Sequence, residues 1–499
     1  MAAGEDLQPS LEVIRDVLAA PTKASQAPNL VPVYAQISSD LITPSTAYLK
    51  ISARSDFVGA GPKKILKTGE GHGPSVDPLP ALEEELAKYT VAHIPGLVLP
   101  PLTGGAIGYV GYDCVRYFEP KTARDMEDVL KVPESLFMFF DTIIAFDRFY
   151  GVIKVITFLH VPVDLSKLEA EYEKCQKTIA ELIDVLQSSE TPLPHQAPIV
   201  LDQKYTSNVG QAGYESHVTT LKKHILKGDI IQAVPSQRFA RPTTLHPFNI
   251  YRHLRTVNPS PYLFYISCAE FQIDGAPPDL LVKSELGRVI THPIAGTVKR
   301  DRAEHVMLVD LARNDIYRVR DPLATRVDRL MAVEKFTHVQ HLVSQVSGVL
   351  RPDKSRFDAF RSIFPAGSAS GAPKVMAMEL IAELEKEKRG VYAGAVGYFG
   401  YGTLDAEGNE VEGAMDTCIA LRTMLVKDQV AYLQAGGGIV FDSDPYDEWV
   451  ETMNKLGASM QTISSGEDLY ARSQDKVAEK EALEVEKAKS SGAHIDLAL

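Results

Sequence analysis

The sequence predicts an α+β fold whose sheets are mainly antiparallel. Strand-like runs of apolar and β-branched residues come in groups, for example 141–146 followed by 150–160. Helical patterns do not alternate strictly with such runs, as they would around a parallel sheet. The chain has 499 residues, enough for roughly two or three domains with large cores. These observations favour a sandwich of antiparallel sheets.

The remaining elements follow from local patterns in chain order. A helix is predicted over 165–186, because apolar residues recur there at helical spacing between charged ones. The second half of the chain mixes short strands with helices. The strands are predicted at 289–292, 394–399 and 429–435, and the helices at 214–227 and 375–387.

Two changes in composition divide the chain. Residues 188–198 (SSETPLPHQAP) hold three prolines among polar residues, which is typical of a linker. After Ile463 the sequence becomes highly charged and lacks a broad apolar face, so we expect a peripheral helix or tail there. We therefore predict an N-terminal domain at 1–187, a linker at 188–200, a second domain at 201–465 and a charged tail at 466–499.

Charge and cysteine usage exclude several classes of protein. The chain has 52 Lys and Arg against 65 Asp and Glu, a net charge of −13 that argues against a broad nucleic-acid surface. Its four cysteines show no paired spacing, so we expect reduced thiols rather than a zinc site or disulfides. No apolar run has membrane-spanning length, and the first residues lack a signal-peptide pattern. We expect a cytoplasmic protein without membrane contact.

One motif points to chemistry without further knowledge. Residues 435–440 (AGGGIV) end a predicted strand with three glycines, where backbone N–H groups can approach an anion. A helix should follow Pro445, with Glu448 and Glu451 on one face.

A second predicted helix, 302–315, carries Glu304 opposite an apolar stripe of Val306, Val309 and Ala312 or their neighbours. If the two helices face each other, their three glutamates form an all-oxygen site suited to Mg²⁺. From spacing alone, solvent-facing glutamates are the more common interpretation.

Other polar residues are uninformative when taken singly. His341 lies on an amphipathic segment, where a structural hydrogen bond is the usual role of a histidine. Arg422 follows an apolar run and would need an anionic partner if buried. Ser368 and Ser370 precede a predicted helix, where hydroxyls usually cap. The sequence contains no GxSxG, P-loop or HExxH motif, and the glycine run lacks the acidic partner of a Rossmann site.

Taken together, the motifs resemble the chorismate-utilising enzymes, and most closely the large-subunit family (component I) of anthranilate synthase, of fungal type. The resemblance covers about 31–463 and rests on strings that occur in the family's order. They are GDIIQAVPSQR (228–238), NPSPYLFY (258–265), THPIAGTVKR (291–300), RAEHVMLVDLARND (302–315), FPAGSASGAPK (364–374), RGVYAGAVGY (389–398), DTCIALR (416–422) and QAGGGIVFDSDPYDEWVETMNK (434–455).

The resemblance implies a two-domain α/β sandwich with the active site between antiparallel sheets, the chorismate-binding enzyme fold. It implies conversion of chorismate and ammonia to anthranilate and pyruvate, the first step of tryptophan biosynthesis, with feedback inhibition by L-tryptophan. Glutamine would supply the ammonia through a separate glutamine amidotransferase subunit, component II. None of the cysteines of this chain sits in the GxCxG setting of an amidotransferase nucleophile.

The resemblance also assigns roles to residues. Glu304 and Glu451 match Mg²⁺ ligands of the family, with Glu448 acting nearby through water. His341 matches a histidine that helps the ring hydroxyl of chorismate to leave, and Ser368 stands where many relatives have threonine. The positions implied to bind substrate are Tyr392, Arg422, Gly437, Gly438, Gly296, Thr297 and Gln232.

Two positions separate sister activities within the family. Ala295 replaces the lysine nucleophile typical of aminodeoxychorismate synthases, and Gln232 replaces the lysine that activates water in isochorismate and salicylate synthases. An uncharged amide cannot act as that base. Both residues favour anthranilate as the product. The alternatives are an aminodeoxychorismate synthase of the same fold and a non-catalytic, tryptophan-sensing regulatory subunit, which would not need the catalytic set.

A regulatory tryptophan site is implied by Asn258, Pro259, Ser260, Pro261 and Tyr262. The chain departs from the family at three places. A leucine-rich Glu-Ser motif is absent after Ile51, and a stretch of roughly 20 residues, several helical turns, is missing after Arg300. The third departure is GAPPDLL, where Pro278 and Asp279 replace the usual serine and glutamate.

Overall fold

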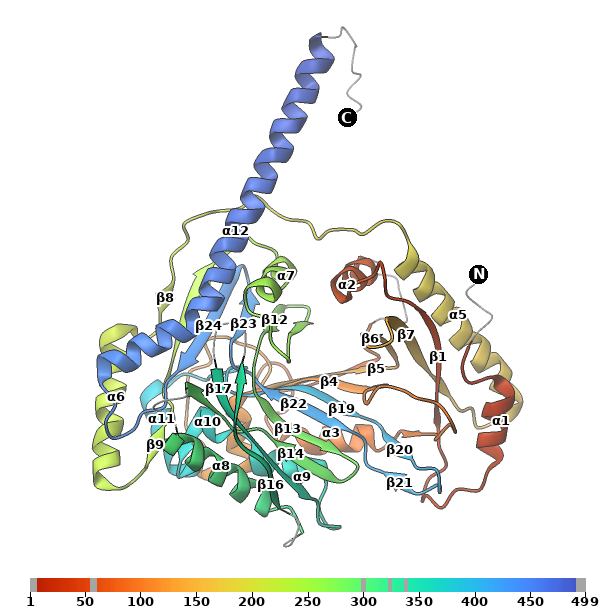
Figure 1. Cartoon of the computed structure of the whole chain (residues 1–499), viewed down its shortest axis with the longest axis horizontal. Helices are drawn as coiled ribbons and strands as arrows, with labels where there is room; N and C mark the ends of the chain where they lie inside the picture. Colours follow the sequence, from red (N-terminus) through yellow and green to blue (C-terminus); the bar gives the residue numbers. More distant parts are fainter. Residues whose placement is uncertain (1–6, 54–60, 298–301, 322–324, 336–339, 491–499) are drawn as a thin grey trace.

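Three large sheets carry the fold in the computed structural model, which describes residues 7–53, 61–297, 302–321, 325–335 and 340–490 (Figure 1). One sheet has ten strands and the other two have six each. Most strand pairs are antiparallel, as the sequence predicts. Within the described residues, no helix has the length and apolar composition needed to cross a membrane.

The ten-stranded sheet joins both halves of the chain. Within it, β4 pairs with β19, and Val110 lies opposite Ala395. The strand order is β15-β17-β14-β13-β22-β19-β4-β5-β2, with β16 beside β17. The strands are β2 (Lys64–Thr68), β4 (Gly105–Val110), β5 (Ser135–Phe140), β13 (Leu280–Glu285), β14 (Arg288–Thr291), β15 (Ile294–Thr297), β16 (Arg326–Lys335), β17 (Gln340–Val349), β19 (Ala395–Gly400) and β22 (Met415–Ile419).

A six-stranded sheet forms the N-terminal side of the molecule. Its order is β21-β20-β3-β1-β7-β6, and helix α5 (Leu168–Gln187) packs on β1 and β7. Helices α1 (Leu11–Ala19) and α2 (Pro44–Ser52) lie on the same side (Figure 1). The strands are β1 (Leu30–Ser38), β3 (Thr90–Val91), β6 (Thr142–Asp147), β7 (Val152–His160), β20 (Gly402–Leu404) and β21 (Glu410–Val411).

The other six-stranded sheet has the order β11-β12-β23-β24-β10-β8. Helices α6 (Gly210–Lys227), α7 (Pro247–Val257) and α12 (Pro445–Ser490) pack beside it (Figure 1). Its strands are β8 (Thr206–Ser207), β10 (Ser236–Pro242), β11 (Phe264–Ser267), β12 (Phe271–Gly275), β23 (Thr423–Lys427) and β24 (Val430–Gly436). A small pair, β9 (Gln232–Ala233) with β18 (Gly371–Ala372), lies beside β24 through a bridge from Ala233 to Ile439.

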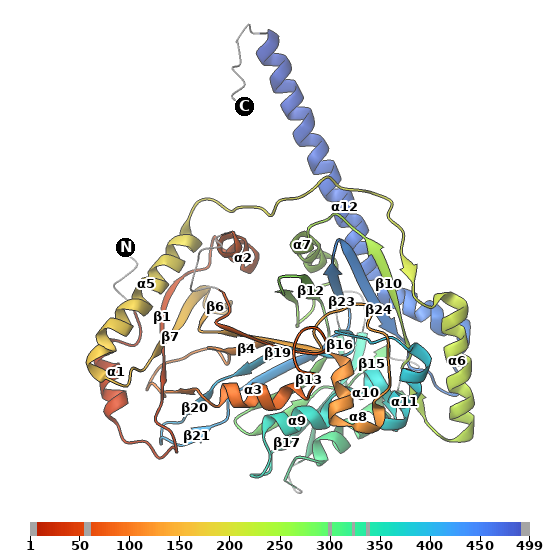
Figure 2. The ribbon, with the colours of Figure 1, turned by 180° about the vertical axis from the view of Figure 1, so that it is seen from behind.

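Helices cover one face of the ten-stranded sheet (Figure 2). Contacts link α8 to β17, α9 to β13 and α3 to β4. These helices are α3 (Pro78–Leu86), α8 (Arg302–Tyr317), α9 (Arg356–Ile363), α10 (Gly367–Ser370) and α11 (Lys374–Glu385). Shorter helical turns are η1 (Tyr112–Cys114), α4 (Val115–Phe118), η2 (Pro120–Thr122) and η3 (Leu165–Lys167).

Local sequence explains where several helices begin and end. Thr43 and Thr46 form a capping box before α2, and Pro44 occupies its first turn. Ser355 and Asp358 do the same for α9. Helix α6 ends at Gly228, whose φ of +83° is the left-handed conformation that glycine adopts without strain. The predicted helices and strands are confirmed, with ends that shift by up to four residues.

The predicted stripe of α8 is partly wrong. Val309 and Ala312 are buried, whereas Val306 is exposed. The buried side consists of His305, Leu308, Val309, Ala312 and Ile316, spaced by three or four residues. Val306 lies about 100° around the helix from His305 and therefore leaves that side.

Helix α12 runs without a break through the predicted boundary at 465 and leaves the body of the molecule (Figure 1). It begins after Pro445 as expected. A buried ion pair of 2.6 Å between Arg241 and Glu467 fixes its middle to strand β10. The segment 190–205 contains no helix or strand, and the predicted division into domains and a linker at 188–200 stays a prediction. All four cysteines are unpaired and buried.

Candidate active site

The glycine turn after β24 is packed too tightly for side chains. The backbone N–H of Gly437 donates to the hydroxyl of Tyr214 at 3.1 Å. A Cβ at Gly436 would collide with the carbonyl oxygen of Pro235, and a Cβ at Gly438 would collide with Nε2 of Gln232. Glycine is therefore required at position 436, where the collision is with backbone, and at 438 a side chain would displace the amide of Gln232.

Glu304 lies directly beside this turn. Its Oε1 accepts a hydrogen bond of 2.8 Å from Nε2 of Gln232. The same oxygen would be 3.1 Å from a Cβ at Gly438. Three of the predicted site residues therefore lie together, although these residues are more than 70 positions apart in sequence. They come from helix α8, strand β9 and the glycine turn.

The two glutamates of α12 differ in their surroundings. Glu448 is buried, and its Oε2 would lie 3.1 Å from a Cβ at Gly437. Glu451 is about half exposed and forms an ion pair of 2.7 Å with Lys455, one turn later. Lys455 also donates to the carbonyl oxygen of Gly436 at 2.9 Å.

The expected three-glutamate cluster is therefore only partly formed. Glu304 and Glu448 flank the glycine turn, while Glu451 is held by Lys455. Among the described residues, no group of three acidic, histidine or cysteine side chains has metal-binding geometry. Two carboxylates beside a glycine cradle still provide the hard oxygen donors that Mg²⁺ uses together with water and substrate oxygens.

A buried arginine network supports Tyr392. Both guanidinium ends of Arg389 contact Glu385, at 2.8 and 2.6 Å, and its remaining N–H groups donate to the carbonyl oxygens of Val234 and Ala369. The guanidinium lies 5.7 Å from the ring centre of Tyr392. Burial raises the pKa of Tyr392 to about 12, although Arg389 opposes the rise, so its hydroxyl stays protonated.

Asp279 also lies near this site, although the sequence analysis assigns it no role. It is buried at the end of the loop before β13, and burial raises the pKa of its carboxyl to about 7. Arg422 and Lys455 lie close enough to oppose this rise. Arg422 has a φ of +49°, a left-handed conformation that non-glycine residues rarely adopt. Two cations and one titratable carboxyl therefore share this side of the glycine turn.

The other predicted residues lie on two neighbouring strands and one short helix. Gly296 and Thr297 belong to β15, and His341 belongs to β17, where its backbone pairs with Thr297. The side chains of Thr297 and His341, and the surroundings of Gly296, lie outside the described part of the structure. Ser368 is half-buried in α10, next to Ala369, whose carbonyl accepts from Arg389.

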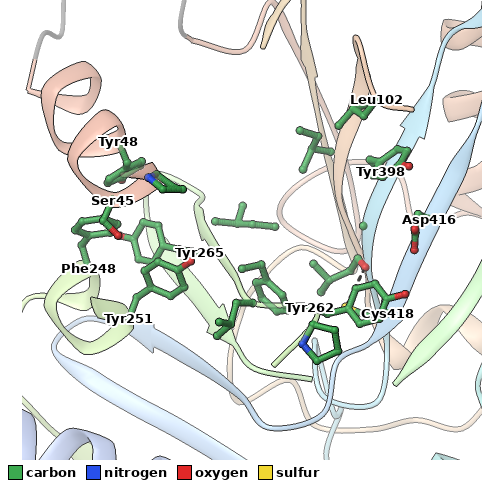
Figure 3. Close-up of a pocket in the computed structure, with 18 residues that line it drawn as sticks. Ser45, Tyr48, Leu102, Phe248, Tyr251, Tyr262, Tyr265, Tyr398, Asp416 and Cys418 are labelled. Atoms are coloured by element: carbon green, nitrogen blue, oxygen red, sulfur yellow. Dashed lines mark hydrogen bonds between the residues drawn. The ribbon is translucent and has the colours of Figure 1, made fainter. Parts of the chain in front are cut away.

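A cavity of about 500 Å³ lies apart from this cluster (Figure 3). Of the five residues predicted for tryptophan, Pro261 and Tyr262 line it. Asn258, Pro259 and Ser260 do not: Asn258 ends helix α7, and the Ser260 hydroxyl donates to the carbonyl oxygen of Pro277.

The cavity has two differently composed ends. At one end, Tyr48 of α2 stacks on Phe248 of α7 with ring centres 4.3 Å apart. At the other end, Tyr398 and Asp416 come from β19 and β22 (Figure 3). Burial raises the pKa of Asp416 to about 6, a rise that Lys283 opposes. The cavity is thus aromatic with one acidic group, and residues from distant parts of the chain form its wall.

Most of the chain is similar in sequence to known proteins of one family. Residues 43–461 match the family described as chorismate binding enzyme. The chain is 54% identical to "Anthranilate synthase component 1" of Saccharomyces cerevisiae, over 94% of this chain and 99% of that protein. It is 52% identical to "Probable anthranilate synthase component 1" of Schizosaccharomyces pombe, over 90% and 96%.

Solved structures agree with this similarity. Anthranilate synthase component I from Streptococcus pneumoniae superposes with a TM-score of 0.67 at 32% identity, covering 88% of this chain and 94% of that one. The menaquinone-specific isochorismate synthase of Escherichia coli gives a TM-score of 0.62 at 17% identity, covering 91% and 98%, and shows the shared fold alone.

Proposed function

The chain belongs to the chorismate-binding enzyme family, as a relative of the anthranilate synthase component 1 proteins, and on this premise we propose the chemistry of its site. Its activity is that of an anthranilate synthase component 1, in the first step of tryptophan biosynthesis. We propose that it adds ammonia to chorismate, releases the ring hydroxyl as water and then eliminates pyruvate to leave anthranilate.

The charges beside the glycine turn support binding of a dianionic substrate. Arg422 and Lys455 can pair with carboxylates, and the backbone N–H of Gly438 can donate to one of them, whereas that of Gly437 is bonded to Tyr214. The protonated hydroxyl of Tyr392, held by the Arg389 network, adds a further donor. We assign the ring pocket to Gly296 and Thr297 of β15, with Ser368 supplying a hydroxyl.

We propose that Glu304 and Glu451 hold Mg²⁺, with Glu448 acting through water. When bound, the cation neutralises the ring carboxylate of chorismate and stabilises charge that develops in the ring. Glu304 and Glu448 already flank the glycine turn. Glu451 would have to leave Lys455, which would free that ammonium group for a substrate carboxylate.

We propose that His341 donates a proton or hydrogen bond to the departing ring hydroxyl. This role rests on the family motif, together with the position of its strand next to β15. Gln232 beside Glu304 carries no basic group, which argues against activation of water at this place. Ala295 likewise offers no nucleophile, which argues against the aminodeoxychorismate route.

Glutamine hydrolysis belongs, in this proposal, to a separate amidotransferase subunit, component II. All four cysteines of the chain are buried, and burial raises the pKa of each thiol. None is therefore an accessible thiolate nucleophile. We also infer a cytoplasmic location, because unpaired thiols are typical of proteins in reducing compartments.

We propose that L-tryptophan inhibits the enzyme by binding the cavity of Figure 3. Pro261 and Tyr262 offer apolar contact to an indole ring, and Asp416 can pair with its ammonium group. The cavity is large enough for an amino acid of this size and lies away from the glycine turn.

One observation carries the proposal: Glu304, Gln232 and Glu448 lie together around the glycine turn. The chain that brings them together is a relative of the anthranilate synthase component 1 proteins. The test is anthranilate fluorescence from purified protein with chorismate, Mg²⁺ and ammonium salt. We expect anthranilate that disappears with EDTA and decreases with added tryptophan. Aminodeoxychorismate as the product, or bound chorismate without turnover, would favour the sister enzyme or the regulatory subunit.

A further inference from the structure

Four exposed apolar side chains lie next to the glycine turn. We call them the apolar rim: Leu226, Ile231, Phe441 and Tyr446, each 54–68% exposed. Single exposed apolar residues are common on protein surfaces and need no explanation. A group of them beside the glycine turn is different, because clustered apolar surface is unfavourable in water and marks a site that a partner covers.

One backbone bridge lies close to two rim residues. Ala233 of β9 forms an isolated antiparallel bridge with Ile439. Ile231 is two positions before Ala233 and Phe441 is two positions after Ile439, so both residues lie near this bridge. Ile231 is also the direct neighbour of Gln232, so this part of the rim adjoins the Glu304 site.

The other two rim residues are fixed by nearby contacts. Lys222 of α6 donates to the carbonyl oxygen of Ser443, and Leu226 follows one turn later on the same side of the helix. Tyr446 lies 6.0 Å from Trp449 between ring centres, and Trp449 packs on the core beneath α6. The rim is therefore a supported surface on α6, β9 and the start of α12.

We propose that the apolar rim is the docking surface for the glutamine-hydrolysing subunit. The inference rests on the proposed function and identifies the surface of this chain that the glutamine-hydrolysing subunit contacts. Ammonia released into water at neutral pH is mostly protonated and no longer a nucleophile. A subunit that supplies it must therefore cover the glycine turn closely, and apolar residues around that turn can exclude water from such a contact.

The test compares two sources of nitrogen in one protein. The variant Leu226→Ser/Phe441→Ser is assayed with ammonium salt alone and then with glutamine plus component II. We expect the glutamine-dependent rate at limiting component II to fall by about tenfold or more, as for other buried apolar anchors. The ammonium-dependent rate should stay within about twofold of the original, because neither residue is part of the catalytic set.

Matched controls are available elsewhere on the surface. Leu41→Ser/Phe149→Ser removes the same residue types from exposed positions remote from the turn, and both rates should stay unchanged. A rim variant with full glutamine-dependent activity would overturn the proposal. The proposal would also be overturned if the wild-type chain alone forms a dimer through Phe441, as measured by its molar mass in solution. A wild-type chain that binds component II through the rim without making anthranilate from ammonium would support the docking surface and defeat the proposed function.

Discussion

Oε1 of Glu304 accepts a hydrogen bond of 2.8 Å from the side-chain amide of Gln232. This contact orients the carboxylate toward the glycine turn without neutralising it, because an amide donates a hydrogen bond but carries no charge. A lysine in place of Gln232 would pair with Glu304 and compete with a divalent cation for the same oxygen. Residue 232 therefore influences both the available base and the charge of the proposed metal ligand.

Replacing Glu451 with glutamine should abolish turnover and leave the fold intact. The side chain is half exposed, and within the described part of the chain its one ion pair is the helical one with Lys455, which contributes about 0.3–0.5 kcal/mol. Anthranilate formation and thermal unfolding are the two measurements. Glu479→Gln, farther along α12, is the control and should keep full activity. Retained activity in Glu451→Gln would refute the metal assignment.

His341→Ala should lower kcat by about 10²–10⁴-fold and leave chorismate affinity nearly unchanged. The reason is that the proposed proton transfer occurs in the transition state, whereas substrate binding is proposed for Arg422 and Lys455. Turnover kinetics and equilibrium binding of chorismate separate the two effects. His253→Ala, on α7, serves as the control. An affinity loss as large as the rate loss would contradict the proposed role.

The KM for chorismate should rise by about tenfold as the pH increases from 6 to 8. Asp279 has a pKa of about 7, so its carboxyl is mostly neutral at the lower pH and ionised at the higher one. Ionised Asp279 competes with the substrate dianion for Arg422 and Lys455. The variant Asp279→Asn should keep a low KM throughout, while Asp416→Asn, in the other cavity, should not alter the profile. A pH-dependent KM in Asp279→Asn would exclude this explanation.

Tyr262→Ala should weaken inhibition by tryptophan about tenfold or more, with little change in turnover. The ring lines the cavity of about 500 Å³ and would be lost from the proposed indole contact. Inhibition curves with increasing tryptophan measure the effect, and exposed Tyr150→Ala is the control. Unchanged inhibition would place the tryptophan site elsewhere.

Asp274→Val should stabilise the protein, most strongly near pH 8. Both carboxylate oxygens of Asp274 are buried and have no hydrogen-bond partner among the described residues, and burial raises the pKa of this carboxyl well above its usual value. The folded protein thus holds a proton that the unfolded chain releases near pH 4, so the free energy of unfolding falls as pH rises above about 4. Urea unfolding at pH 4 and pH 8 should show the larger gain at pH 8. Asp274→Asn removes the ionisation alone and should give an intermediate gain; equal gains at both pH values would rule out titration as the cause.

Local sequence predicted the elements well and their arrangement less well. Periodicity located helices such as α5, and the glycine run marked the turn where Glu304 and Glu448 meet. Periodicity contains no information on partners such as β4 and β19, which are nearly 300 residues apart. For the same reason the cavity between α2 and α7 could not be predicted.

The direction of individual side chains also could not be predicted from local sequence. Spacing placed Glu448 and Glu451 on one side of α12, but the preference of Glu451 for Lys455 depends on a contact one turn away. Val306 was assigned to the wrong side of α8, because three apolar residues at regular spacing fit two adjacent stripes almost equally well. In the sequence, Asp279 stands out only as a departure from the family pattern, because its burial arises from the tertiary structure.

The pairing of β4 with β19 also determines how the protein would respond to a break in its backbone. Cleavage within 190–205 would produce two polypeptides, yet both would still contribute strands to the same ten-stranded sheet. The fragments should stay associated under native conditions and separate only when that sheet unfolds. The gene could therefore be divided at this segment, and the two products should reassemble as a complementing pair.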